Sequence, residues 1–453
     1  MARAVFLIGL CALAFIAGAA TTTTFEVFPY RQFRDARLAL RALLPALGVG
    51  QPTVFMGYDK DYSQPTVIEY GNATENDHLI LVGGGPYELM SECPEQGCLA
   101  WIIDRQGRVV HAWPLDLDLL WGERAREAGA GPLDRLVPMG LHLFANGDLL
   151  VSYQSSSAFP YAIGIAKLDK AGNLLWRQQN LSHHWFSLDE GGRIYVPSQR
   201  LAPAPVALGG GVEITCETGF VYDDEIKVLD ADGRLLRELP VLKALLAADY
   251  PGLLHHAEAL GSEQCDPMHL NDVRVLPARL APDYPGLAAG DLLVSLRTSN
   301  ALAVLDGTSG RVKWLLAGRT LAQHSPRFSG ANKVLAFDNK GGLDPENLSR
   351  LVEIDLATNA VRTVYPVPGG SGAGRFATVF AGHIDLHPDG RRALVALADQ
   401  GRIVEIDLAS GTVVWEYVNT HPVPGEERPV RMAAMSAYYV PEAAFAAEAH
   451  SKR

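Results

Sequence analysis

Six copies of one short hairpin pattern recur along the chain and constrain its fold more than any other feature. Each copy is an apolar, β-branched run, a turn that opens with aspartate, and a second apolar run. Runs of this kind bounded by Asp, Asn and Gly are typical of two strands joined by a tight turn. The six turn aspartates are Asp104, Asp169, Asp230, Asp306, Asp355 and Asp407.

The hairpins follow one another at intervals of about fifty to seventy-five residues. This is the period of propeller blades that carry loop insertions. We therefore predict an all-β fold, a six-bladed β-propeller in which each blade has an inner strand, a second strand and the hairpin as its outer pair. The strand signals begin at Asp77, and no long helical pattern interrupts them.

A histidine stands at or near the predicted inner strand in five of the six copies. Because the inner strands of a propeller line its central channel, five histidines should point towards one axis. The alternative for each is a histidine that is hydrogen-bonded within a tight junction between blades. The five are His142, His184, His269, His324 and His383.

His324, which follows Gln323, is the candidate nucleophile, since neutral imidazole attacks electrophilic centres near neutral pH. His269 and Asn271 are two residues apart in a strand-like run, so we expect both to face the channel. Arg297 ends an apolar strand and offers forked donors to an oxyanion. Of the pair at 183 and 184 we choose His184, which is nearer the strand, and expect its neighbour to face solvent.

A metal site is an alternative at His383, Asp385 and His387, because a strand would present all three alternating side chains on one face. However, the His-Pro-Asp-Gly sequence that begins at His387 is typical of a turn and should end the strand there. We therefore predict no metal ligands.

Four features that follow one another along the six-blade repeat resemble the bacterial arylsulfotransferase family. These are the aryl-sulfate sulfotransferases that use no nucleotide donor. The resemblance covers roughly residues 77–419. The four features are the His-His pair 183–184, the His-Leu-Asn sequence 269–271, the strand-terminal Arg297 and the Gln-His pair 323–324.

The resemblance implies that a sulfuryl group passes from a phenolic sulfate ester to a phenolic acceptor, without a cofactor, by ping-pong kinetics. His324 would be sulfurylated transiently, and His184, His269 and Arg297 would bind the sulfuryl group and the phenolic oxygen. To these we add predicted substrate-binding residues and aromatic side chains that could flank the phenol. They are Asn271, His383 and His142, and the aromatic residues Tyr153, Trp185 and Phe328.

The N-terminal run from Ala4 to Phe25 carries no charge and is long enough to span a bilayer. Four arginines at helical spacing follow it, which indicates an amphipathic helix on anionic headgroups. We therefore predict a signal-anchor at 1–28, a juxtamembrane helix at 29–46, a lead-in segment at 47–76, the propeller at 77–431 and a C-terminal tail at 432–453.

Cysteine usage favours export. Of the five cysteines, Cys11 lies in the apolar run, and the other four suit two disulfides, Cys93–Cys98 and Cys216–Cys265. The arginines after the span favour the opposite orientation by the positive-inside rule. We predict the periplasmic face of the inner membrane, or a soluble periplasmic protein if the chain is cleaved near Ala20.

Two other functions remain open. One is a non-catalytic propeller that serves as an accessory or scaffold subunit of a membrane complex, which the anchor and the apolar stretch at 432–447 favour. The other is a quinoprotein dehydrogenase, whose propeller turns also run from aspartate to tryptophan, although six blades and the lack of an adjacent cysteine pair count against it. The net charge of −12 argues against nucleic acid as a partner.

Overall fold

The computed structural model describes residues 66–70, 78–84, 92–93, 97–120, 136–155, 162–209, 212–216, 219–250, 252–254, 265–342, 347–367, 374–421 and 430–441. All of these lie in the larger of two compact units, Thr53–Arg453. The predicted anchor at 1–28 and juxtamembrane helix at 29–46 lie outside the described residues. Among the residues that are described, no helix is both long and apolar enough to cross a membrane.

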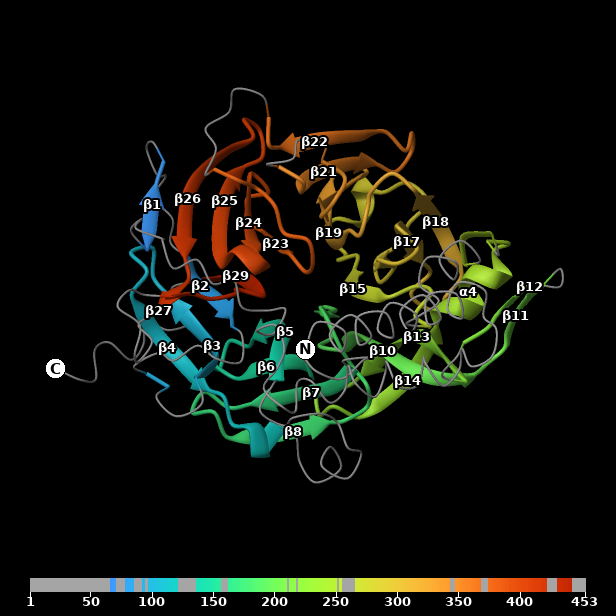
Figure 1. Ribbon diagram of the computed structural model, residues 1–453, viewed down its shortest axis with the longest axis horizontal. Helices are drawn as coiled ribbons and strands as arrows, with labels where there is room; N and C mark the ends of the chain where they lie inside the picture. The colour runs from blue at the N-terminus through green and yellow to red at the C-terminus, as the bar shows by residue number, and fades with distance from the viewer. Residues whose placement is uncertain are drawn as a thin grey trace, which may run out of the picture. The chain divides into compact units, whose positions relative to one another are not determined.

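Six antiparallel sheets stand around a central axis, which confirms the predicted six-bladed propeller (Figure 1). From the inner to the outer strand, the first two blades are β5 (Leu136–Leu143), β6 (Leu149–Ser155), β7 (Ala162–Leu168) and β8 (Leu174–Gln178), then β9 (Ser187–Leu188), β10 (Ile194–Pro203), β13 (Phe220–Leu229) and β14 (Leu235–Pro240). The next two are β15 (Leu270–Val275), β16 (Leu292–Leu296), β17 (Ala301–Leu305) and β18 (Val312–Ala317), then β19 (His324–Gly330), β20 (Lys333–Asp338), β21 (Arg350–Asp355) and β22 (Val361–Tyr365).

The last two blades close the ring. The fifth is β23 (His383–Leu386), β24 (Arg392–Leu397), β25 (Arg402–Asp407) and β26 (Thr412–Val418), and the sixth is β29 (Ser436–Pro441), β2 (His78–Gly83), β3 (Cys98–Ile103) and β4 (Val109–Pro114). Smaller elements decorate them: the pairs β11 (Val206–Gly209) with β12 (Val212–Ile214) and β27 (Thr420–His421) with β28 (Val430–Arg431), the helix α4 (Val241–Ala247), and 3-10 turns at Ala281–Asp283 and Ala398–Gln400.

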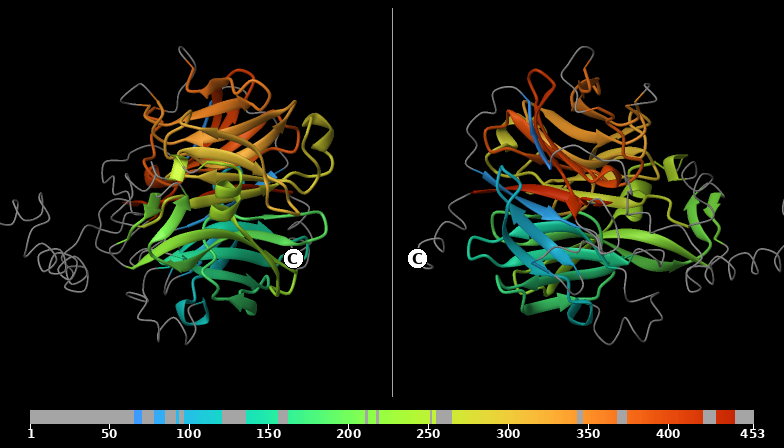
Figure 2. Two further views of the ribbon diagram at one scale, coloured as in Figure 1. Left: turned by 90° about the vertical axis from the view of Figure 1, so that its right-hand side faces the viewer. Right: turned by 60° about the vertical axis from the view of Figure 1, so that its left-hand side comes forward.

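Two strands from predicted flanking segments belong to this closure. β29 falls in the segment that we predicted as a C-terminal tail, and it is the inner strand of the sixth blade, paired with β2. In the side views of Figure 2 the red C-terminal strand lies beside the blue N-terminal ones. β1 (Val67–Glu69), in the predicted lead-in, adds a fifth strand beyond β26. Joining the two ends of the chain in one sheet leaves no open seam in the ring.

The turn aspartates have a clear local role. Asp306 Oδ1 accepts hydrogen bonds from the backbone N–H groups of Thr308 and Ser309 at 3.1 and 2.7 Å, and Asp104 Oδ1 likewise accepts from Gln106 and Arg108 at 3.0 and 2.9 Å. An aspartate that satisfies the turn's own N–H groups fixes the hairpin without help from the rest of the fold. The six predicted hairpins are confirmed.

Strands in the middle of a blade, such as β16 and β17, are buried throughout, because both faces of a blade pack against neighbouring blades. Tryptophans on the outer strands add hydrogen bonds between blades. Their indole N–H groups donate from Trp113 to the Asp169 carbonyl, from Trp176 to the Ala231 carbonyl, from Trp314 to Asn359 Oδ1 and from Trp415 to the Arg105 carbonyl. Both predicted disulfides, Cys93–Cys98 and Cys216–Cys265, are present.

Candidate active site

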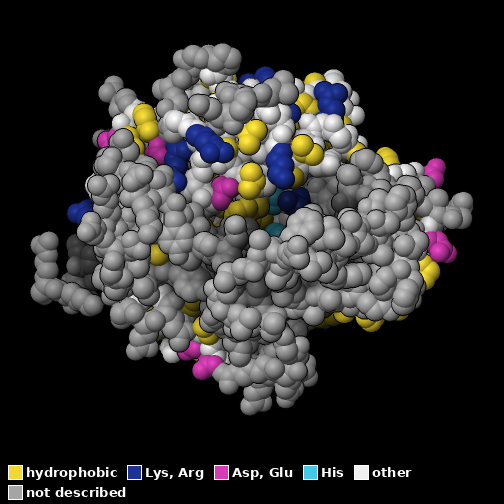
Figure 3. Space-filling model, in the orientation of Figure 1, with side chains coloured by type: hydrophobic (Ala, Val, Ile, Leu, Met, Phe, Trp, Pro, Cys, Tyr) yellow, Lys and Arg dark blue, Asp and Glu magenta, His cyan; other side chains and the backbone are white. Residues whose placement is uncertain are grey.

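Four of the predicted site residues come together at one end of the channel. His324 is the first residue of β19, and His269 directly precedes β15. His184 lies just before β9, and Arg297 directly follows β16. The rings of His184 and His269 have centroids 5.1 Å apart, and the charges of Arg297 and His269 act on His324. Figure 3 shows a hollow over the centre of the ring where histidine, basic and hydrophobic side chains gather.

Two of these histidines have left-handed backbones. His184 has a φ of 51° and His269 a φ of 53°, a conformation that is uncommon for residues other than glycine. The strand therefore begins at Leu270, so our prediction that His269 and Asn271 share one strand face is wrong. The fully buried Asn271 donates from Nδ2 to the Gln323 carbonyl at 3.0 Å and so braces the residue before His324.

His324 is held in one tautomer. Its Nδ1 lies 2.7 Å from Asn339 Oδ1, and Asn339 Nδ2 donates to the carbonyls of Thr378 and Ala381 at 3.0 and 2.6 Å. Because those two donations fix which end of the amide is oxygen, Nδ1 of His324 must carry the proton. Burial, and then the charge of Arg297, holds the pKa of His324 well below its usual value. The imidazole is therefore neutral, with its lone pair on Nε2.

His269 is held by Asp266, three residues earlier in the chain. Its Nδ1 lies 2.7 Å from Asp266 Oδ2, and its backbone N–H donates to Asp266 Oδ1 at 3.0 Å. A carboxylate at Nδ1 keeps a proton there and leaves Nε2 to exchange protons with a ligand. The disulfide residue Cys265 precedes Asp266, so the Cys216–Cys265 bridge anchors this carboxylate.

His183 is buried, contrary to our expectation that it faces solvent. Only 2% of the residue is exposed. Its Nδ1 lies 2.7 Å from Nδ1 of His184, and its Nε2 lies 3.9 Å from Asp224 Oδ1. Burial, and then the charge of His269, lowers the pKa of His183 to about 3. Burial, and then the charge of His183, holds the pKa of His184 well below its usual value.

Arg297 supplies the positive charge. Its side chain is partly buried, and in the described part of the chain no hydrogen bond or ion pair occupies its guanidinium. Burial lowers its pKa, and the nearby charge of Asp266 acts in the opposite direction. An arginine whose donors are free, beside three histidines, is suited to bind a small anion such as a sulfuryl group.

His383 is separated from this cluster. It is fully buried at the start of β23, and its Nε2 accepts a hydrogen bond from Arg327 Nη2 at 2.8 Å. The ring of Trp185 packs against both His324 and His383. Its centroid lies 5.8 Å from that of the His324 ring and 6.0 Å from that of the His383 ring. The structure therefore does not bring His383 to the nucleophile, whereas Trp185 does lie beside it. Tyr153 and Phe328 pack instead in the cores between blades.

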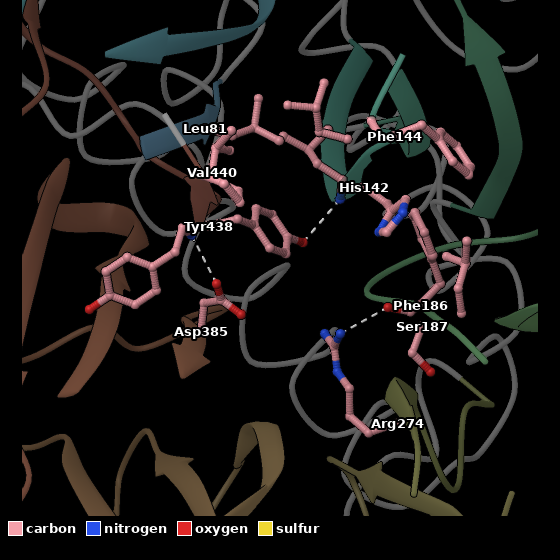
Figure 4. A pocket seen from close by; sticks show the side chains of 15 residues that line it. Leu81, His142, Phe144, Phe186, Ser187, Arg274, Asp385, Tyr438 and Val440 are labelled. Atoms are coloured by element: carbon pink, nitrogen blue, oxygen red, sulfur yellow. Dashed lines mark hydrogen bonds between the residues drawn. The ribbon is translucent and has the colours of Figure 1, made fainter. Parts of the chain in front are cut away.

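His142 lies at the opposite end of the channel, because it stands near the end of β5 rather than at its start. It lines a cavity of about 720 Å³ with Phe144, Arg274, Asp385 and Tyr438 among its other walls (Figure 4). The structure therefore does not place His142 with His324 for substrate binding.

The three residues of the alternative metal site, His383, Asp385 and His387, each bind a different partner. His383 faces Arg327, Asp385 accepts a hydrogen bond from the backbone N–H of Tyr439, and His387 Nδ1 lies 2.8 Å from Asp389. No group of three or more potential metal ligands occurs among the residues that the structure describes.

Three residues that hold the site were missed in the sequence. Asp266 could have been noticed from its spacing of three residues before His269. Asn339 directly follows β20, in an Asp-Asn sequence of the kind that is typical of a turn. His183 is one of two adjacent histidines, and nothing in the local sequence distinguishes which of them is buried.

Six blades with a cluster of histidines and one arginine at one end of the channel define a β-propeller protein with a candidate site for a small anion. The chain belongs to the arylsulfotransferase (ASST) family, whose model matches residues 140–420, more than half of its length. No curated protein matches the chain.

Solved structures that resemble the chain share little sequence with it. A Bacteroides caccae protein of unknown function is 13% identical, with a TM-score of 0.43 over 80% of this chain and 98% of its own. Hydrazine synthase of Kuenenia stuttgartiensis is 11% identical, with a TM-score of 0.39 over 75% and 79%. Virginiamycin B lyase of Staphylococcus aureus is 10% identical, with a TM-score of 0.35 over 63% and 71%.

Proposed function

We propose that this protein transfers a sulfuryl group from a phenolic sulfate ester to a phenolic acceptor through a sulfurylated His324. The observation that carries the proposal is the state of His324, whose Nδ1–H is bound by Asn339 while its Nε2 lone pair lies in the field of Arg297. Membership of the arylsulfotransferase family supports sulfuryl transfer as the class of reaction.

In the first half-reaction, Nε2 of His324 attacks the sulfur and the bond from sulfur to the phenolic oxygen breaks. The transition state spreads negative charge over the sulfuryl oxygens, so fixed donors from Arg297 and His184 stabilise it. The phenolate leaves with the electron pair and takes the Nε2 proton of a doubly protonated His269, whose Nδ1–H stays on Asp266. Asn339 Oδ1 stabilises the positive charge that the ring of His324 acquires at Nδ1–H.

In the second half-reaction, an acceptor phenol takes the place of the first. Nε2 of His269 removes its proton, the phenolic oxygen attacks sulfur, and the bond from sulfur to His324 Nε2 breaks. Donor and acceptor use the same site in turn, which gives ping-pong kinetics. The ring of Trp185, edge-on to His324, is placed to contact the phenol.

The first test is intact-protein mass after incubation with 4-nitrophenyl sulfate and no acceptor, at mildly alkaline pH. We expect the protein to gain one sulfuryl group and to release one equivalent of nitrophenol, and we expect His324→Ala to lose both. The matched control is His142→Ala, at the other end of the channel, which should still be sulfurylated. Wild-type protein that gains no mass and releases no nitrophenol would contradict the proposal.

We further propose that the reaction takes place at the periplasmic face of the inner membrane, with residues 1–28 as the anchor. The two disulfides support an oxidising compartment.

A further inference from the structure

Two buried polar atoms behind His184 have no hydrogen-bond partner among the described residues. They are Nε2 of His183 and Oδ1 of Asp224. The two residues are 2% and 0% exposed, and these atoms lie 3.9 Å apart. Leaving two such atoms unpaired is costly, and a small rotation of either side chain would join them. Asp224 is already held on its other side, since Oδ2 accepts from the Leu270 N–H at 2.7 Å.

The contact between the two histidines extends this pair into the site. Nδ1 of His183 and Nδ1 of His184 are 2.7 Å apart, so one of them must donate and the other accept. Both rings are neutral, because burial depresses the pKa of each. The proton position on one ring therefore dictates that on the other, and the three side chains form a chain from Asp224 to the sulfuryl pocket.

This chain has two self-consistent states that differ by one proton. In the donor state, Asp224 is protonated and donates to Nε2 of His183, His183 donates from Nδ1 to Nδ1 of His184, and His184 presents Nε2–H to the site. In the acceptor state, every one of these hydrogen bonds is reversed. Asp224 is then a carboxylate that accepts from His183, and Nε2 of His184 presents a lone pair to the site.

We propose that Asp224 and His183 are positioning residues that convert His184 from an acceptor into a donor when the site holds an anionic sulfate ester. The inference rests on the proposed function. One proton enters at Nε2 of His184, the Nδ1 proton of His184 passes to Nδ1 of His183, and the Nε2 proton of His183 passes to Asp224. No bond to sulfur changes in this step, and binding takes up one proton.

The groups around the chain support this assignment. Burial, and then the charge of Asp266, raises the pKa of Asp224 well above its usual value, so its carboxyl is suited to store a proton. An ester anion at Nε2 of His184 favours the donor state, and raising the pH favours the acceptor state. The groups around Asp224 are Asp223, Gln199, Asp266 and the Leu270 N–H. Those around His183 are His269, Asp266, Lys227 and the backbone of Ser198. Those around His184, besides His183, are His269, His324 and Arg297.

The test uses Asp224→Asn, an amide of the same shape. Because the Leu270 N–H holds the amide oxygen on the far side, the amide nitrogen faces Nε2 of His183, donates to it and so fixes the donor state. Between pH 6 and pH 9 we expect the wild-type KM for 4-nitrophenyl sulfate to rise, approaching tenfold per pH unit above the titration of the chain. In the variant it should change less than about threefold, since no proton is exchanged. Asp223→Asn, the same change one residue away, removes a neighbouring charge that raises the pKa of Asp224, so it should move the dependence to lower pH without abolishing it.

Binding of inorganic sulfate gives a second readout that needs no turnover. Calorimetry in buffers of different ionisation enthalpy should show about one more proton taken up by the wild type than by Asp224→Asn. Equal uptake in the two proteins, or an unchanged pH dependence of KM in the variant, would overturn the relay. Wild-type protein that binds sulfate with this proton uptake but transfers no sulfuryl group would retain the relay and contradict the proposed function.

Discussion

At the scale of single residues, the site is organised by what binds Nδ1 of each histidine. Asn339 holds that atom in His324, Asp266 holds it in His269, and His183 holds it in His184. In each case Nε2 is left for the ligand, and the nature of the Nδ1 partner decides whether Nε2 attacks, exchanges a proton or donates. The three partners therefore give three chemically similar side chains different roles.

Asn339→Asp tests this at the nucleophile. A carboxylate at Nδ1 stabilises the imidazolium form of His324 and should raise its pKa by about 1 to 3 units from its depressed value. Since only the neutral ring attacks sulfur, activity is lost as pH falls through that pKa. The acid limb of kcat/KM should therefore move to higher pH, measured with 4-nitrophenyl sulfate between pH 4 and pH 8. A limb that stays in place while the variant folds, as checked by its melting temperature, would exclude this role.

At the scale of strands and turns, the blades are tied by side chains on their outer edges. The indole of Trp415 on β26 donates to the Arg105 carbonyl at 3.0 Å, and the Arg105 guanidinium lies 4.3 Å from the centre of that ring. Arg105 in turn lies 2.6 Å from Glu405 on β25. This arrangement crosses the junction between the fifth and sixth blades, where the last part of the chain meets the first.

Trp415→Phe removes the indole donor and part of a fully buried ring. We expect it to lower the free energy of unfolding by about 2 to 3 kcal/mol, from one lost hydrogen bond and an underfilled site. Trp176→Phe loses an equivalent bond at a half-buried position and should cost about 1 kcal/mol or less. Urea unfolding of both variants measures the difference. Equal losses would show that the buried junction gives no additional stability.

At the scale of the whole molecule, closure depends on segments from both ends of the chain. β29 completes the blade that β2 begins, and β1 extends the blade that β26 ends. The two disulfides act more locally. One joins Cys93 to the first residue of β3, Cys98, and the other joins Cys216 to Cys265, next to the site. Both bridges support the proposed location in an oxidising compartment.

The oxidation state of the cysteines tests the proposed periplasmic location. Protein taken from cells, denatured and treated with a thiol reagent without reduction should leave four cysteines unlabelled, namely Cys93, Cys98, Cys216 and Cys265. Cys11 serves as an internal reporter: one labelled thiol indicates that the N-terminal run is retained, and none indicates cleavage near Ala20. Labelling of all four before reduction would contradict export.

The blade pattern could be predicted because each hairpin is determined by neighbours in sequence. An aspartate such as Asp306 binds backbone groups two and three residues away, so the turn is visible in the local sequence. The number of such hairpins then gave the number of blades. The position of a histidine at the start of an inner strand, as for His324, similarly indicated which side chains would meet at the channel.

The sequence alone therefore determined the blades and the four side chains that converge, because these follow from local turns and strand positions. Only the tertiary structure decided that β29 closes the ring, that His142 and His383 lie apart from the cluster, and that Asn339 holds His324. Those outcomes depend on hydrogen bonds and burial between residues far apart in the chain. Such contacts form only when the blades are assembled, and no local pattern specifies them.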